Sequence, residues 1–280
     1  MPTTTRIEEG AGALEAMLGE HPVFTTADLR DCLPALGGLG SARQVIARWE
    51  STGRVVRVRP GLYAAVPAGS AGPDLFSPYG YLVACKLAPD AVVSHHGALQ
   101  FFGCAYSIWS EYVYSATVPR APFRYATNGY RGTRYPAALL RSGREQWGVV
   151  EQRRRGGVVR VTSLERTFVD VLAAPRLAGG WEEVWRSLQM VDALDVSQVV
   201  EYATFLDNVT ACAKVGYFLE RHREFWPFDD PALDALRNRK PRRPQHMDRR
   251  AGGDLVREWN LIVPHAVAEE TWDQFYGYRW

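Results

Sequence analysis

The chain has 280 residues, of which 46% are hydrophobic and 23% charged, and its formal net charge is only +2. These values exclude a disordered or fibrous chain and are typical of a globular protein with sizeable cores, while the length favours two domains. The small net charge does not by itself indicate a nucleic-acid partner, so the local distribution of charge is the better guide.

The cysteines and the apolar stretches indicate a cytoplasmic protein without a membrane partner. The four cysteines are far apart and form no CxxC pair, which argues against a zinc ribbon and a disulfide framework. The first ten residues, MPTTTRIEEG, lack the pattern of a signal peptide. The most apolar stretch, GALQFFGCAYSIW, is too short to span about 30 Å of hydrocarbon.

Residues 1–66 predict three helices. Thr25 and Asp28 have the spacing of a capping box for the second helix, and Ser41 can cap the third, which ends at Gly53. Apolar residues recur at helical spacing in all three: Ile7, Leu14, Met17 and Leu18, then Leu29, Cys32 and Leu33, then Val45, Ile46 and Trp49.

A β-hairpin is predicted directly after the third helix. Val56 and Val58 alternate with Arg57 and Arg59, which is the period of a half-buried strand, and Pro60-Gly61 fits a type II turn before a return strand. Three helices followed by a two-stranded wing is the order of a winged helix-turn-helix domain, whose later helix enters the major groove of DNA.

The charge of this segment supports the DNA-binding interpretation. Residues 1–31 hold two arginines and six acidic residues, whereas residues 41–61 hold five arginines and one glutamate. A surface that faces a duplex needs positive charge to displace counterions. Arginine and glutamine side chains suit base edges, and a helix N-terminus suits a phosphate. The candidate DNA-binding residues are Ser41, Arg43, Gln44, Arg48, Arg54, Arg57 and Arg59. The alternative is a structural helix and hairpin with solvated arginines.

A segment rich in Pro, Gly, Ser and Ala, residues 67–78, is predicted to link this domain to a larger one, residues 79–280. Ser77-Pro78 and Ser94 are expected to start two helices, and Thr162 with Glu165 to cap a third, in which Arg166 and Asp170 can pair. Strands are expected near residues 112–118, 123–127, 148–152 and 158–162, and again at WNLIVP. We therefore expect an α+β fold whose second domain has an antiparallel or mixed sheet.

No catalytic, cofactor or metal site is predicted. The chain has no GxxxxGK[ST] or GxSxG motif, and adjacent residues such as His95 and His96 point in different directions on a helix. Two basic segments, residues 120–160 and 237–250, are left without an assigned role; flanking DNA, an acidic partner and plain solvation are all open for the first of them.

Several motifs in this order resemble the AbiEi-type antitoxins of bacterial abortive-infection systems: RPGLY, SHHGALQFFG, VTSLERTFVDVL, GGWEEV, KVGYFLE and WNLIVP. The resemblance implies a winged-helix domain that represses its own operon at operator DNA. It also implies a C-terminal domain tied to neutralisation of a nucleotidyltransferase-like toxin, and it offers no catalytic residues. The alternatives are a ligand-responsive winged-helix regulator without a toxin partner and, less favoured, an enzyme such as a nuclease that uses His95 or His96 with Asp170.

Overall fold

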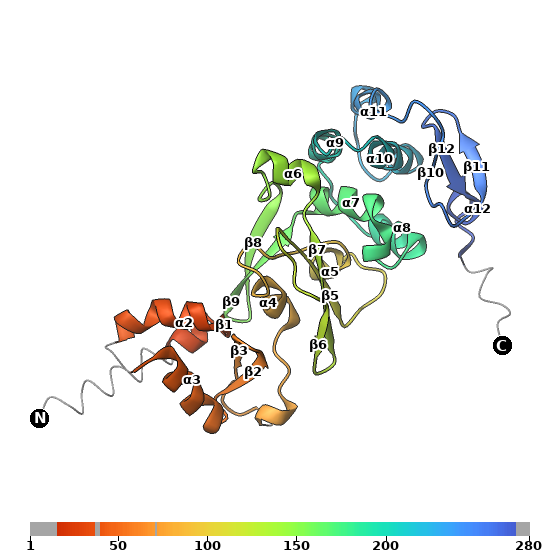
Figure 1. The fold of residues 1–280 in the computed structure, drawn as a ribbon. Helices are drawn as coiled ribbons and strands as arrows, with labels where there is room; N and C mark the ends of the chain where they lie inside the picture. Colours follow the sequence, from red (N-terminus) through yellow and green to blue (C-terminus); the bar gives the residue numbers. More distant parts are fainter. Residues whose placement is uncertain (1–15, 37–39, 71, 273–280) are drawn as a thin grey trace, which may run out of the picture. The chain divides into compact units, whose positions relative to one another are not determined.

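The computed structural model describes residues 16–36, 40–70 and 72–272, and it is an α+β fold with three sheets (Figure 1). Two compact units are formed: the first from residues 1–93, 110–134 and 150–161, and the second from residues 94–109, 135–149 and 162–280. This division differs from the predicted one, in which a linker at residues 67–78 separates two continuous stretches of sequence. The predicted domain boundary stays a prediction. No helix of the described ranges is long and apolar enough to cross a membrane.

The first unit begins with a small three-stranded sheet and the helices that cover it. The strand order is β1-β3-β2, and both pairings are antiparallel, so β3 is central. The elements in chain order are β1 (Val23–Thr25), α2 (Thr26–Cys32), the 3-10 helix η1 (Leu33–Leu36), α3 (Ala42–Ser51), β2 (Val55–Arg59) and β3 (Leu62–Ala65).

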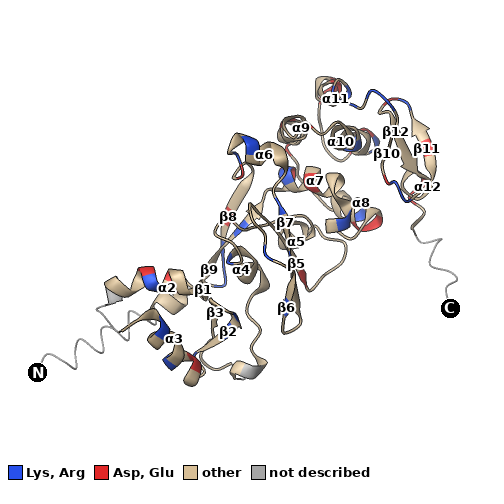
Figure 2. Cartoon of the chain, in the orientation of Figure 1, with Lys and Arg blue, Asp and Glu red and all other residues tan. Residues whose placement is uncertain are grey.

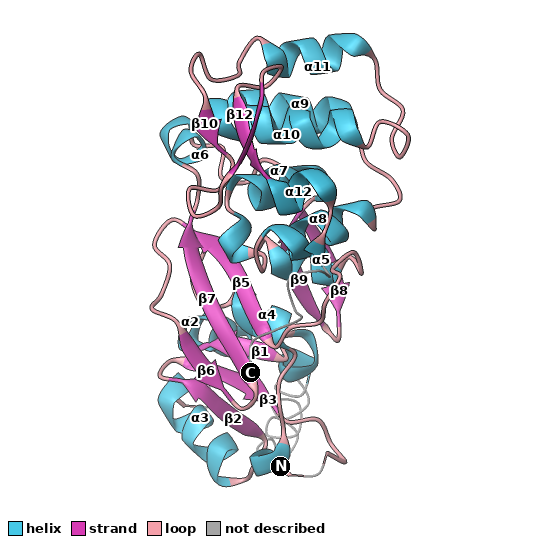
Figure 3. Cartoon of the chain, turned by 90° about the vertical axis from the view of Figure 1, so that its right-hand side faces the viewer, coloured by secondary structure: helices cyan, strands magenta, loops and turns pink. Residues whose placement is uncertain are grey.

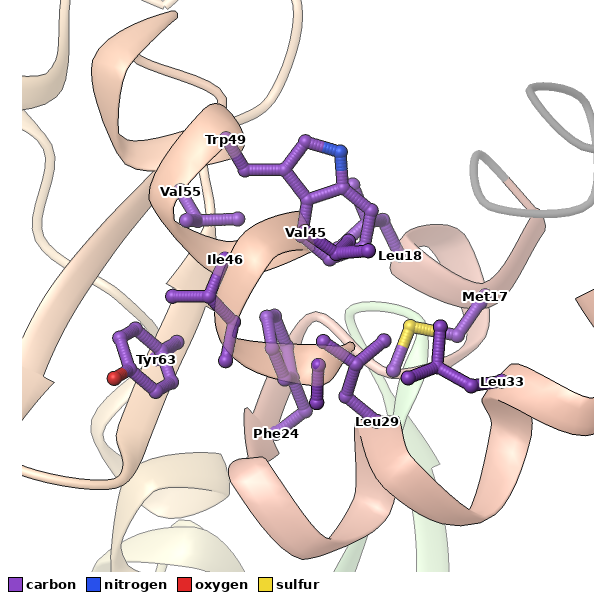
Figure 4. Close-up of a cluster of buried hydrophobic side chains, with 11 residues drawn as sticks. Met17, Leu18, Phe24, Leu29, Leu33, Val45, Ile46, Trp49, Val55 and Tyr63 are labelled. Atoms are coloured by element: carbon purple, nitrogen blue, oxygen red, sulfur yellow. The ribbon is translucent and has the colours of Figure 1, made fainter. Parts of the chain in front are cut away.

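The apolar faces of these elements meet in one core (Figure 4). Phe24 is fully buried at its centre and contacts the Trp49 ring edge-on at 6.0 Å between centroids and the Tyr63 ring in a stack at 5.8 Å. The helical stripes predicted from spacing are confirmed here: the buried members are Met17, Leu18, Leu29, Leu33, Val45, Ile46 and Trp49. Ile7 and Leu14 lie outside the described residues.

The predicted hairpin is confirmed, but strand β1 was not predicted. Gly61 has a φ of 80°, as the second central position of a type II turn requires. Gly53 follows α3 with a φ of 67°. Val23–Thr25 is only three residues long, too short for an alternating pattern to reveal it, and its pairing partner β3 begins 37 positions after Thr25.

The first unit also contains a six-stranded mixed sheet of order β6-β7-β5-β4-β9-β8, which confirms the mixed alternative. Figure 3 shows its strands β5 and β7 side by side. Strands β5 and β7 run parallel, as do β4 and β9, whereas β6–β7 and β4–β5 are antiparallel. The bounds are β4 (Val92–Val93), β5 (Glu111–Ala116), β6 (Phe123–Tyr125), β7 (Asn128–Arg134), β8 (Val149–Arg154) and β9 (Gly157–Thr162).

Two short helices precede this sheet in the first unit, and one predicted start is wrong. The 3-10 helix η2 (Pro73–Leu75) lies inside the segment predicted as a linker. Helix α4 (Gly80–Cys85) begins after Tyr79, not at Ser77-Pro78, and Ser77 instead accepts a 3.4 Å hydrogen bond from the Asn128 side chain. Every residue of α4 is buried, so its position is set by packing rather than by a cap.

The second unit is mainly helical and ends in a small mixed sheet. Helices α7, α9, α10 and α11 pack together, and α10 also contacts β12. The bounds are α5 (His96–Phe101), α6 (Ala137–Ser142), α7 (Leu164–Ala173), η3 (Pro175–Leu177), α8 (Trp181–Gln189), α9 (Val196–Phe205), α10 (Val209–Arg221), α11 (Asp230–Arg237), β10 (Gln245–His246), β11 (Gly253–Val256), β12 (Leu261–Pro264) and α12 (His265–Glu269).

The helix starts in this unit correct two predictions. Asn208 caps α10 through the Ala211 amide. Ser163, not Thr162, caps α7, because Thr162 ends strand β9 and its hydroxyl lies 2.7 Å from that of Thr167. Ser94 does not cap α5; the residue before that helix is His95, which makes no capping hydrogen bond. The predicted strand at WNLIVP is β12.

Candidate nucleic-acid interface

The N-terminus of α3 is closed by a reciprocal pair of hydrogen bonds. The Ser41 hydroxyl accepts from the Gln44 amide at 3.4 Å, and the Gln44 side-chain oxygen accepts from the Ser41 amide at 2.9 Å. This capping box satisfies two backbone groups that would otherwise need other partners. Two predicted DNA contacts, Ser41 and Gln44, therefore have a structural role in the free protein, although both side chains are exposed.

Arg43 and Arg48 are exposed on α3, whose buried residues are Ala42, Val45, Ile46 and Trp49. Figure 2 shows the Lys and Arg positions along α3 in blue. Neither guanidinium has an ion pair, hydrogen bond or ring contact among the residues that the structure describes. Glu50, at the other end of the helix, is the only acidic residue of α3. The exposed face of α3 is therefore positively charged and carries two arginines available to a ligand.

Arg57, on strand β2, is held by this glutamate. Its Nε and Nη2 atoms each donate a 3.0 Å hydrogen bond to the Glu50 carboxylate, and its guanidinium lies 5.8 Å from the Tyr63 ring centroid. The carboxylate of Glu50 raises the pKa of Arg57 above its usual value. The pair neutralises much of the charge that the sequence pattern assigned to a wing.

Arg59 also lies on β2 and contacts the six-stranded sheet of the same unit. Its guanidinium sits 5.0 Å from the ring centroid of Phe123 on β6, and its Nη1 atom is buried without a hydrogen-bond partner in the described part of the chain. Arg54, the remaining predicted contact, is half-buried directly after Gly53, where its carbonyl accepts from the Val66 amide at 2.8 Å.

A second cluster of polar side chains lies in the second unit around His96. Its Nε2 atom is 3.1 Å from Glu183 Oε1, and its ring stacks on Trp109 with centroids 3.8 Å apart. Glu183 also accepts from the Ser107 amide at 2.9 Å and from its hydroxyl at 2.5 Å. Burial lowers the pKa of His96 despite the neighbouring carboxylate.

The neighbouring His95 belongs to a different set of contacts. It is buried, has a φ of 53°, and its Nδ1 atom lies 3.0 Å from the Ser94 hydroxyl. The predicted pairing of Arg166 with Asp170 is confirmed, with Nε and Oδ2 3.5 Å apart, and both side chains are buried rather than on a helix surface. Tyr202 donates a 2.9 Å hydrogen bond to the same carboxylate.

These two buried clusters are held mainly by contacts among their own members, and Arg166 also donates to the carbonyls of Glu145 and Trp147 at 2.8 and 2.6 Å. Among the described residues, four polar atoms of the clusters are nevertheless buried without a hydrogen-bond partner: His96 Nδ1, Arg166 Nε and Nη2, and Asp170 Oδ2. Within the described ranges there is also no group of three or more His, Cys, Asp or Glu residues that could hold a metal ion. Sequence reasoning did not find the partners Glu183 and Tyr202, because each lies 32 or more positions from the side chain that it contacts.

The fold as a whole matches a solved structure over almost its full length. The α+β architecture is similar to that in the crystal structure of the Rv2827c protein from Mycobacterium tuberculosis, with a TM-score of 0.57. The two chains are 16% identical, and the match covers 92% of each, so this likeness concerns the fold alone. No family model matches the chain, and no curated protein matches it. The resemblance to AbiEi-type antitoxins therefore remains an expectation from its motifs.

Proposed function

We propose that this chain binds double-stranded DNA through α3, with the β2–β3 hairpin as the wing of a winged helix-turn-helix domain. The observation that carries the proposal is the exposed face of α3, where Arg43 and Arg48 have no partner in the described structure. The opposite face of the helix holds it on the core through Val45, Ile46 and Trp49. A rigid helix with free arginines on its outer face suits contacts to base edges and phosphates in the major groove.

The proposed DNA contacts are fewer than the sequence pattern implied. Arg57 shares its charge with Glu50, and Arg59 is directed to Phe123, so neither is as available as the two α3 arginines. We therefore place the main interaction on Arg43 and Arg48 and assign the hairpin a supporting part.

A gel-shift titration with the DNA upstream of the chain's own gene tests this function. The wild type should shift that fragment at protein concentrations that leave a shuffled fragment of equal length free. The double variant Arg43→Gln/Arg48→Gln should need at least about tenfold more protein, because each lost base or phosphate contact costs roughly 1–3 kcal/mol. Equal shifts by the wild type and the double variant would remove α3 from the interface.

The wider biological role that we propose is that of an antitoxin that represses its own operon. The support is the order of motifs shared with AbiEi-type antitoxins, and the proposed partner is a nucleotidyltransferase-like toxin encoded beside this chain. Expression of the neighbouring gene alone should arrest growth, and co-expression of this chain should restore it. The product of the neighbouring gene should also be tested for co-purification with the tagged chain. A harmless and unbound neighbour would leave the alternative, a winged-helix regulator without a toxin partner.

A further inference from the structure

The first unit contains an open cleft of about 1010 Å³, and it is separate from the exposed face of α3. One wall comes from α2 and the β2–β3 turn, and the other from the C-terminal end of α4 and strands β8 and β9. This volume is at the upper end of the roughly 300–1,000 Å³ that small-molecule sites occupy.

Cationic side chains outnumber acidic ones around this cleft. Three carboxylates line it, those of Glu20, Asp28 and Glu151. Asp28 is already engaged, because it accepts from the Thr25 amide and from Lys86 Nζ at 2.8 and 2.9 Å. The cationic residues that line the cleft are Arg30, Arg59, Lys86, Arg120, Arg153 and Arg160.

Three of these cationic side chains are not neutralised by an acidic residue of the described structure. Arg30, Arg120 and Arg153 are exposed, and none of them has a carboxylate partner among the described residues. Arg120 and Arg153 donate only long hydrogen bonds, of 3.4 Å each, to the carbonyls of Leu87 and Gly156. A concave surface with an excess of one charge concentrates its field on ions of opposite sign, so this cleft attracts anions.

The inner surface of the cleft is apolar. Leu62, Leu82 and Leu87 line it, and each is at least nine-tenths buried. Cys85 also lines it, and burial raises the pKa of that thiol to about 11, so it is not a thiolate nucleophile at neutral pH. The cleft therefore has the character of a binding site with an apolar floor and a cationic rim.

We propose that this cleft binds a small phosphate-bearing ligand of nucleotide size, with its phosphates on the arginine rim and its apolar part against the leucine floor. Guanidinium groups form paired, charge-assisted hydrogen bonds with phosphate oxygens. A duplex is contacted by elements that protrude into its grooves, whereas a recessed cleft suits a ligand that enters it. This site does not depend on the proposed DNA binding, and its occupant would connect α2 and the hairpin with the six-stranded sheet.

Isothermal titration of the full chain with ATP, pyrophosphate, adenosine and sulfate tests the proposal. ATP should bind most tightly, pyrophosphate more weakly, and adenosine and sulfate least, because only ATP offers both phosphates and an apolar ring system. The variant Arg30→Gln/Arg153→Gln should weaken ATP binding at least about tenfold. The α3 variant Arg43→Gln/Arg48→Gln loses the same charge outside the cleft and should bind ATP like the wild type.

A second variant, Arg120→Glu, guards against misfolding of the first, and circular dichroism should show both folded. Equal affinity for sulfate and ATP, or equal ATP binding by wild type and both cleft variants, would overturn the proposal. An equal loss of ATP affinity in the α3 variant would overturn it as well.

A titration of the same proteins with a short duplex of arbitrary sequence distinguishes the two possible sources of phosphate. If the cleft variants lose duplex binding but not ATP binding, the cleft holds a nucleic-acid backbone instead, and the small-ligand proposal is wrong.

Discussion

Arg59 shows how little an alternating pattern says about the partner of a side chain. The sequence places Arg57 and Arg59 on the same outer face of a strand, and the structure gives them different partners, Glu50 and Phe123. The β2–β3 register shifts between these two arginines, which changes the local course of the strand. Phe123 is 64 positions later in the chain, so no local pattern could reveal this contact.

Lys214 allows a prediction of stability at the scale of one residue. It is buried on α10, its Nζ lies 5.0 Å from the Trp181 ring centroid, and burial lowers its pKa to about 8. Below pH 8 the folded protein must hold a buried charge that the unfolded chain keeps in water. Lys214→Met should therefore raise the free energy of unfolding at pH 7 by about 2–3 kcal/mol.

The pH dependence checks the sign of this effect. Between pH 8 and the ordinary lysine value of 10.5 the unfolded chain binds more protons, so the wild type gains stability as pH rises through that range. The difference between Lys214→Met and the wild type, measured by urea unfolding, should shrink from pH 7 to pH 10. A difference that is constant with pH would contradict a lowered pKa of Lys214 in the folded protein.

The buried histidines make a second prediction, in the acidic range. Burial lowers the pKa of His95, His96 and His222, so they remain neutral in the folded protein where the unfolded chain protonates them. Below their ordinary pKa of 6.5 the unfolded state binds more protons than the folded state. The free energy of unfolding therefore decreases as the pH is lowered, by up to about 1.4 kcal/mol per pH unit for each histidine. The urea midpoint of His96→Gln should fall less between pH 6.5 and 5.5 than that of the wild type; parallel curves would show that His96 does not contribute.

At the scale of an element, α3 is the helix whose boundaries the sequence predicts best. Ser41 and Gly53 are local signals, and the structure has the capping box at one and a positive φ at the other. Helix α4 lacks such signals at its ends and is placed by burial of all six residues, which is why the prediction at Ser77-Pro78 fails. Local caps are readable from sequence, whereas a start that is set by packing is not.

The capping box yields a prediction for α3 itself. Ser41→Ala removes the acceptor for the Gln44 amide and should lower the free energy of unfolding by about 1 kcal/mol in a denaturant titration. Ser51→Ala, at the other end of the same helix, removes a hydroxyl that only donates to the Arg48 carbonyl and should change stability by less than about 0.5 kcal/mol. Equal effects of the two changes would contradict a capping role for Ser41.

At the scale of the whole molecule, the predicted α+β class with a mixed sheet is confirmed, whereas the winged helix-turn-helix domain stays a proposal. Composition could not reveal how the chain divides into two compact units. The chain passes between the two units five times, and the six-stranded sheet is assembled from segments on both sides of the helices α5 and α6. A composition shift marks only the Pro- and Gly-rich segment near residue 70, which lies inside the first unit, whereas all five crossings occur in ordinary loops and strands. Arg43, Arg48 and Arg57 are exposed, as the sequence pattern predicts, whereas Arg54 and Arg59 are half-buried. The partners of these arginines, which decide which guanidinium groups are available to a ligand, could not be predicted.

The most direct test of the central claim, that the exposed face of α3 binds DNA, is the salt dependence of binding to the upstream fragment by fluorescence anisotropy. For Arg43→Gln/Arg48→Gln we predict at least about tenfold weaker binding at low salt and a slope of log affinity against log salt that is less steep by about 1–2. Arg242→Gln/Arg243→Gln, which removes two exposed arginines of the second unit, should leave both quantities near the wild-type values. Unchanged affinity and slope in the α3 variant, or the same loss in both variants, would contradict it.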